Sequence, residues 1–169
     1  MASPNIEIII KHFEFITESA RPYIEDSGFK LNFNYSEYAE LLLKIKNLSI
    51  DKPIESFELA KDIDDWIKYF SNLHSICIKL LADSEAYEKR TYAYISLTSN
   101  KDSQDNVSKG NRFADQDDLV LKCRLKKNAL KAYTDTLEKK IKELERNFYL
   151  AKATYSNYYN DKQRYKLHP

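Results

Sequence analysis

Apolar residues recur at helical spacing over a long stretch that begins at Pro53. They advance by alternating steps of four and three residues, which keeps them on one face of an α-helix. The pattern continues for about five heptads and has only two weak points, Ser84 and Thr91. A helix is therefore expected from Pro53 to near Leu97. Its predicted apolar face consists of Leu59, Ile63, Trp66, Phe70, Leu73, Cys77, Leu80, Ser84, Tyr87, Thr91 and Tyr94.

A second stretch of the same kind follows and is expected to end near Asp161. Asp115 is a good candidate for its N-cap, because a carboxylate can accept hydrogen bonds from the free N–H groups of the first turn. Lys126 occupies one step of the apolar face, and two consecutive steps of four residues within 133–141 shift that face locally. The predicted apolar face consists of Leu119, Cys123, Leu130, Tyr133, Leu137, Ile141, Leu144, Phe148, Ala151, Tyr155 and Tyr158.

A polar segment near residues 98–113 separates the two stretches. It is rich in Ser, Asn, Asp and Lys and includes Gly110, which predicts a loop. Two long apolar helices joined by one loop predict a long antiparallel helical hairpin, coiled-coil-like, over residues 53–165. No strand-like alternation competes with this pattern, so the expected fold class is all-α.

Residues 1–50 predict a shorter helical pair that precedes the hairpin. Ser3, followed by proline, is typical of a helix start, and this helix is expected to close near residues 20–27, around a proline and a glycine. Asn34 can cap the second helix of the pair.

The composition favours one mostly helical domain. Among 169 residues only two are glycine and four are proline, so few helix breakers are present. The chain begins without the pattern of a signal peptide, and no apolar run approaches the roughly 20 residues that span a bilayer. Cys77 and Cys123 form no disulfide framework. A soluble, cytoplasmic protein with reduced thiols and no membrane partner is expected.

The net charge of +1 hides an uneven distribution along the chain. Residues 1–66 hold 7 basic and 13 acidic residues, whereas residues 67–169 hold 20 basic and 13 acidic residues. Such a split predicts either that the basic half meets an acidic partner or that the two halves attract each other, within one subunit or between subunits. A solvated helical surface with uneven charge is the remaining interpretation.

No group of residues predicts catalysis. The three histidines, His12, His74 and His168, are scattered, and no Ser/His/Asp or Cys/His grouping can be placed. The acidic run at residues 62–65 is best interpreted as solvated charge, and both glycines are isolated, which excludes a phosphate-cradling loop. We expect neither enzymatic activity nor a cofactor nor a metal site.

The basic residues suggest a binding function. Cations neutralise phosphates, and nearby aromatic rings offer stacking surfaces that are indifferent to base sequence, so their combination predicts single-stranded nucleic acid as a ligand. The alternative is that the tyrosines belong to the core and the lysines are simply solvated. Aromatic residues are interleaved with the candidate cations, which are Lys89 and Arg90 within the segment from Tyr87 to Tyr94, and Lys122, Arg124, Lys126 and Lys127.

Four segments occur in a distinctive order between residues 60 and 162. They are an aromatic-rich helix through 71–76, a basic and Tyr-containing stretch at 89–94, the run Ala-Asp-Gln-Asp-Asp-Leu-Val-Leu-Lys at 114–122, and a final helix with Leu-Glu at 137–138, Arg-Asn-Phe at 146–148 and Lys152. In this pattern the chain resembles the phage recombination mediator UvsY and its relatives, small helical proteins of T4-like phages. The first fifty or so residues lie outside the resemblance, and the proteins of that family look shorter.

The resemblance implies a ring-like homo-oligomer that binds single-stranded DNA in a phage-infected bacterial cell. Such a protein helps a RecA-like recombinase displace the single-strand-binding protein and load onto the strand. The basic DNA contacts of the family map best onto Lys89 and Arg90, whereas the four cations at 122–127 are added here from charge density. Assembly is expected to use the C-terminal aromatic residues Phe148, Tyr155, Tyr158 and Tyr159.

Two other function classes fit the same sequence. One is a structural or scaffolding coiled-coil protein, for instance a virion component, in which the charge split pairs subunits. The other is a small helical inhibitor or adaptor that binds one protein partner. DNA binding should weaken steeply with added salt because counterions are released, whereas a scaffold should assemble without nucleic acid.

Overall fold

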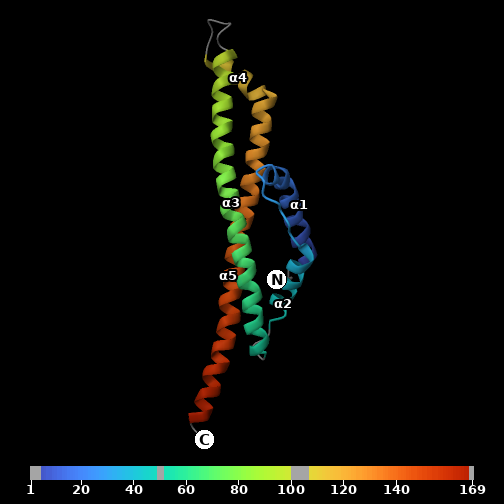
Figure 1. The fold of residues 1–169 in the computed structure, drawn as a ribbon, viewed down its shortest axis with the longest axis vertical. Coiled ribbons are helices and arrows are strands. Elements are labelled where there is room, and N and C mark those ends of the chain that lie inside the picture. The colour runs from blue at the N-terminus through green and yellow to red at the C-terminus, as the bar shows by residue number, and fades with distance from the viewer. Residues whose placement is uncertain (1–4, 49–51, 100–106, 168–169) are drawn as a thin grey trace. The chain divides into compact units, whose positions relative to one another are not determined.

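The computed structural model describes residues 5–48, 52–99 and 107–167 (Figure 1). Within these ranges the chain forms five helices and no strand, which confirms the predicted all-α class. The helices are α1 (Ile6–Glu25), α2 (Tyr35–Lys46), α3 (Pro53–Ser99), α4 (Val107–Gln116) and α5 (Asp118–Leu167).

The starts and ends of the first two helices follow from local chemistry. The side chain of Asn5 accepts a hydrogen bond from the backbone N–H of Glu7 at 3.0 Å, whereas the predicted cap Ser3 lies outside the described residues. Asn34 caps α2 as expected, because its side chain accepts from the first-turn N–H groups. Gly28, just beyond α1, has φ +88°, a left-handed conformation that glycine adopts without strain.

The described residues fall into two compact units, and each contains a length of α3 packed along a length of α5. The first unit takes the described residues within Met1–Phe15, Asn32–His74 and Thr136–Pro169, and the second takes those within Ile16–Leu31 and Ser75–Asp135. In the first unit Phe57 of α3 meets Tyr155 of α5, with ring centroids 4.7 Å apart. The pKa of Glu138 on α5 is lowered mainly by Lys142, with a smaller contribution from His74 of α3, so these two helices also approach each other there. Residue numbers on α3 therefore rise as those on α5 fall, so the helices are antiparallel there.

The second unit shows the same direction. Ser96 near the end of α3 donates a hydrogen bond to Asn111 of α4, and Glu88, further back on α3, pairs with Arg124 of α5. Each unit, taken by itself, therefore agrees with the predicted antiparallel helical hairpin. Residues of the N-terminal helices are distributed over both units.

The core of the first unit is a cluster of aromatic rings. Phe13 of α1 packs on Tyr38 of α2 and on Phe70 of α3, with centroids 5.9 and 5.8 Å apart. Phe33, from the segment between α1 and α2, stacks on Phe70 at 5.8 Å. Rings of this size bury much apolar surface, so the cluster fixes the N-terminal helices against α3. Its remaining members are Tyr35, Trp66 and Tyr69.

The predicted loop near residues 98–113 is largely wrong. Helix α3 continues to Ser99 and α4 occupies Val107–Gln116, and residues 100–106 of this segment lie outside the described residues. Between residues 110 and 116, α4 buries two small residues, Gly110 and Ala114, beside the half-buried Asn111. A search for large apolar residues at helical spacing cannot detect such a helix, because its packing depends on close approach.

The predicted N-cap of the last helix is also wrong, by two residues. Asp117 holds that position, with its carboxylate accepting from the backbone N–H groups of Leu119 at 2.8 Å and Val120 at 3.3 Å. Asp115 instead lies in α4 and pairs with Arg124. The run of acids at 115–118 offers several capping carboxylates, and the end of α4 at Gln116 decides between them.

Candidate nucleic-acid interface

The two tyrosines near the end of α3 lie on the surface. Tyr87 and Tyr94 were expected on the apolar face, but their exposed fractions are 56% and 67%. Ser84 and Thr91 of the predicted face are buried as expected, with Glu88 half-buried between them. The predicted face is wrong at the two tyrosines, because Glu88 rather than Tyr87 turns toward α5, where it meets Arg124 and Lys127.

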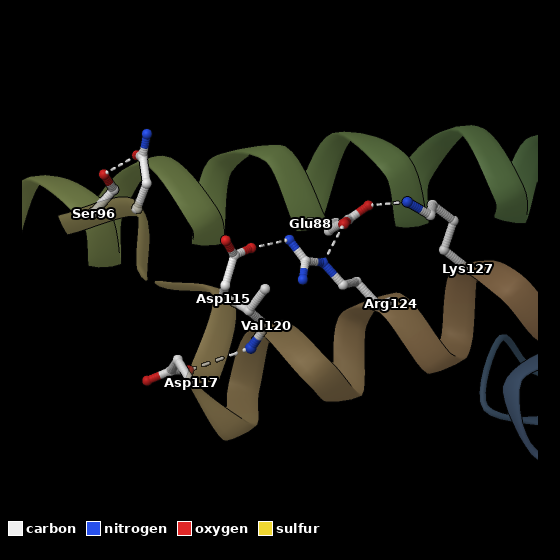
Figure 2. Close-up of polar contacts among 8 residues, drawn as sticks. Glu88, Ser96, Asp115, Asp117, Val120, Arg124 and Lys127 are labelled. Carbon is white, nitrogen blue, oxygen red and sulfur yellow. Dashed lines mark hydrogen bonds and ion pairs between the residues drawn. The ribbon is translucent and has the colours of Figure 1, made fainter. Parts of the chain in front are cut away.

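A network of ion pairs explains the change of face. Glu88 accepts from Arg124 Nε at 3.2 Å and, through its other oxygen, from Lys127 Nζ (Figure 2). Asp115 accepts from Arg124 Nη2 at 2.8 Å, so the network joins α3, α4 and α5. The hydrogen bond from Lys127 lowers the pKa of the Glu88 carboxyl, with a further contribution from Arg124. Asp115, followed by Glu88, raises the pKa of Arg124.

The network changes the list of candidate DNA contacts. All six predicted cations, Lys89, Arg90, Lys122, Arg124, Lys126 and Lys127, belong to the second unit. Arg124 and Lys127 are occupied by carboxylates of the same chain. Lys126 is half-buried, with its ammonium 6.0 Å from the ring centroid of Tyr23.

The other three cations are available to a ligand. Lys89, Arg90 and Lys122 are exposed, and no ion pair joins any of them to another described residue. Arg90 lies three residues after Tyr87 and four before Tyr94, and this spacing places all three side chains on one face of α3. Lys89 lies about 100° around the helix from Arg90. The exposed stripe of ring, cation and ring is the most distinctive arrangement in this unit, and we call it the Tyr87–Tyr94 stripe.

The charge imbalance along the sequence does not carry over to the folded units. Among the described residues the second unit holds 12 basic and 10 acidic residues, and the first holds 14 basic and 13 acidic. Acidic residues of the N-terminal third and basic residues of the last third thus share the same unit. A candidate interface on this protein is consequently a local group of exposed cations rather than a broad electropositive face.

The predicted assembly residues divide into two kinds. Phe148 and Tyr155 are half-buried within the first unit, where Tyr155 packs on Phe57. Tyr158 and Tyr159 are exposed, by 39% and 53%. Only this last pair is therefore free to contact another chain.

On α5 the predicted apolar face is wrong at its first position. Leu119 is exposed by 47%, whereas Val120 is fully buried. The new cap at Asp117 and the polar network around Arg124 set the rotation of this end of the helix.

No grouping of His, Cys, Asp and Glu suited to a metal ion occurs among the described residues. The acidic run before Trp66 is paired: Asp62 accepts from Lys44 at 2.8 Å, and Asp64 and Asp65 both accept from Lys68. Burial raises the pKa of the Cys77 thiol to about 12, which makes it a poor nucleophile at neutral pH. Across the described helices, none is both long and apolar enough to cross a membrane.

No protein-family model, curated protein or solved structure matches this chain.

Proposed function

We propose that this protein is a non-enzymatic, single-stranded-DNA-binding accessory of recombination. In this proposal it acts as a homo-oligomer and helps a RecA-like recombinase displace the single-strand-binding protein and load onto the strand. The DNA-binding part of the proposal is supported by the second unit. The recombinase part depends on the resemblance of residues 60–162 to the UvsY family.

The observation that carries the proposal is the Tyr87–Tyr94 stripe. The exposed rings of Tyr87 and Tyr94 lie about 10 Å apart along the helix, because seven residues rise by about 1.5 Å each. Arg90 lies between them on the same face and pairs with no described acidic residue. A single strand needs this alternation, since its bases stack on the rings while its phosphates meet the cation.

One subunit offers few unpaired cations, so its affinity for DNA is expected to be modest. Several such sites on one oligomer act together, because binding at the first site raises the effective concentration of the strand at the next. No covalent bond is made or broken. The strand is held by many weak contacts, which a recombinase can replace one at a time.

The test is the fluorescence anisotropy of a labelled oligothymidine against protein at two salt concentrations, with oligomer mass measured in parallel. We expect binding that weakens steeply with salt. Lys89→Ala with Arg90→Ala should lower the affinity and reduce the slope of log K against log salt by about 1.4 per subunit engaged, with helicity and mass unchanged. Comparison of the single variants should give the larger loss for Arg90→Ala.

A control variant separates local contact from net charge. Lys61→Ala with Lys68→Ala also removes two exposed cations, but these lie in the first unit beside Glu58, Asp64 and Asp65. We expect this control to bind nearly as well as the unmodified protein. Absence of binding by the unmodified protein at low salt would exclude the proposed function.

A second candidate function rests on a different observation. Several large apolar side chains of the second unit are exposed, and such side chains commonly mark contacts between proteins. They favour a scaffold or adaptor whose partner is a protein, and such a protein would assemble without nucleic acid and ignore it at physiological salt. These side chains are Leu97, Phe113, Leu119, Leu121 and Leu125.

A further inference from the structure

A groove of about 640 Å³ opens on the second unit beside the Tyr87–Tyr94 stripe. This volume lies within the roughly 300–1,000 Å³ that is common for small-molecule sites. Three elements line it: the end of α1 with the residue after it, α3, and the start of α5. Tyr87 belongs to both the stripe and the groove, so a ligand on the stripe is next to the groove.

The groove divides its charges between its walls. Both carboxylates come from the α1 and α3 sides, Asp26 just after α1 and Asp83 on α3. Both ammonium groups, those of Lys122 and Lys126, come from α5. The rest of the lining is mostly apolar and aromatic, and consists of Tyr23, Leu80, Ser84, Tyr87, Leu119, Cys123 and Leu125.

A nucleotide has the same division of properties. Its base is flat and largely apolar, its base edge carries hydrogen-bond donors and acceptors, and its phosphate is anionic. We propose that the groove receives one unstacked base of the bound strand, with the adjacent phosphate on Lys122 and Lys126. This inference rests on the proposed function, and it assigns a base-binding site to the same surface.

The two carboxylates give the site a base preference. They repel phosphate, so the backbone stays on the α5 side and the base edge turns toward Asp83 and Asp26. A carboxylate accepts a hydrogen bond from the exocyclic amino group of cytosine, whereas the matching position of thymine is a carbonyl oxygen. The groove therefore prefers cytosine to thymine, two bases of the same ring size.

The first test compares oligodeoxycytidine, oligothymidine and an abasic strand of equal length, in anisotropy titrations at one low salt concentration. All three strands carry the same phosphates, so any difference reports the bases. We expect the abasic strand to bind about tenfold more weakly than oligodeoxycytidine, in line with the loss of base stacking. Oligothymidine should fall between them.

Variants assign the effect to the groove. Tyr87→Ala should reduce the preference for oligodeoxycytidine over the abasic strand to about twofold or less, whereas Tyr87→Phe should retain it. Tyr149→Ala is the matched control, because Tyr149 is exposed by 68% but belongs to the first unit. Asp83→Asn should remove the difference between cytosine and thymine strands. Equal binding of oligodeoxycytidine and oligothymidine by the unmodified protein would overturn the inference while leaving the proposed function intact, because stacking on the stripe does not depend on the identity of the base.

A second measurement is independent of strand binding. Deoxycytidine monophosphate at millimolar concentration should shift the NMR signals of the Tyr87 ring, and deoxyribose 5-phosphate should not. If no oligonucleotide binds at low salt, the proposed function fails, and this titration alone decides whether the groove accepts a nucleotide. Unchanged Tyr87 signals with the monophosphate would exclude a base site in the groove.

Discussion

The hydroxyl of Tyr38 is buried in the aromatic cluster of the first unit without a hydrogen-bond partner. Burial, with a smaller contribution from the charge of Glu143, raises the pKa of Tyr38 above its usual range. The ring contributes packing, with Trp66 and Phe70 at centroid distances of 5.1 and 5.3 Å. The hydroxyl itself costs stability, since it leaves water and gains nothing in exchange.

Tyr38→Phe is therefore expected to leave the free energy of unfolding unchanged or to raise it by about 1 kcal/mol. Tyr69→Phe is the matched control, because the Tyr69 hydroxyl donates to the backbone carbonyl of Asn32 at 2.9 Å. Tyr69→Phe should lower the free energy of unfolding by about 0.5–1 kcal/mol. Urea unfolding followed by circular dichroism measures both variants. If Tyr38→Phe lowers the free energy of unfolding by more than about 1 kcal/mol, the Tyr38 hydroxyl is hydrogen-bonded in solution.

At the scale of the helices, the Glu88 network fixes how α4 and α5 meet α3 in the second unit. The Glu88 side chain is only 13% exposed and has two cationic partners, Arg124 and Lys127. A half-buried carboxylate with charge-assisted hydrogen bonds contributes more than an exposed surface pair. The network also keeps Arg124 and Lys127 away from any ligand.

Glu88→Gln is expected to lower the free energy of unfolding at pH 7 by about 1–3 kcal/mol, because the charge on both hydrogen bonds is lost. The folded-state pKa of Glu88 is depressed, so its contribution is complete above its unfolded pKa of about 4.3 and is lost as the pH falls through the folded value. The difference between the two proteins should thus be constant above about pH 5 and shrink below it.

The control for this prediction is Glu138→Gln. Glu138 pairs with Lys142 on the surface of α5, where both side chains are more than half exposed. We expect it to change stability by less than about 0.5 kcal/mol. Denaturant titration at several pH values measures the free energy of unfolding of both variants. Equal effects of the two substitutions would show that the Glu88 network contributes no more than a surface pair.

The contrast between predicted and observed elements has a physical basis. The long helices and the Asn34 cap follow from local spacing and local hydrogen bonding, which the sequence states directly. The exposure of Tyr87 and Tyr94 could not be predicted, because Glu88 packs inward only where Arg124 and Lys127 lie opposite. Helix α4 was missed because it packs through Gly110 and Ala114. The charge pattern of the sequence indicates Lys89 and Arg90, which are exposed, whereas helical spacing alone places Tyr87 and Tyr94 in the core.

At the scale of the whole molecule, the near-neutral charge of each unit limits what long-range attraction can contribute to DNA binding. Affinity must then come from short-range contacts repeated over several subunits. The proposed function consequently depends on assembly more strongly than it would for a highly basic protein. The exposed pair Tyr158 and Tyr159 near the end of α5 is the surface through which we expect the subunits to assemble.

Tyr155 rests on Phe57 near the start of α3, and the exposed Tyr158 and Tyr159 follow within four residues. If this pair contacts another subunit, Tyr158→Ser with Tyr159→Ser should lower the native mass toward the 19.9 kDa of one chain. Affinity for a long oligonucleotide should then fall by at least tenfold, whereas affinity for a strand that reaches one subunit should change little.

Tyr149→Ser provides the control for this pair, because it removes an exposed aromatic side chain of the same helix. Native mass by light scattering and anisotropy with the two strand lengths are the measurements. A double variant of unchanged mass would exclude the pair from the subunit interface. Reduced mass with unchanged affinity for the long strand would contradict the dependence of DNA binding on assembly, since effective concentration would then contribute nothing.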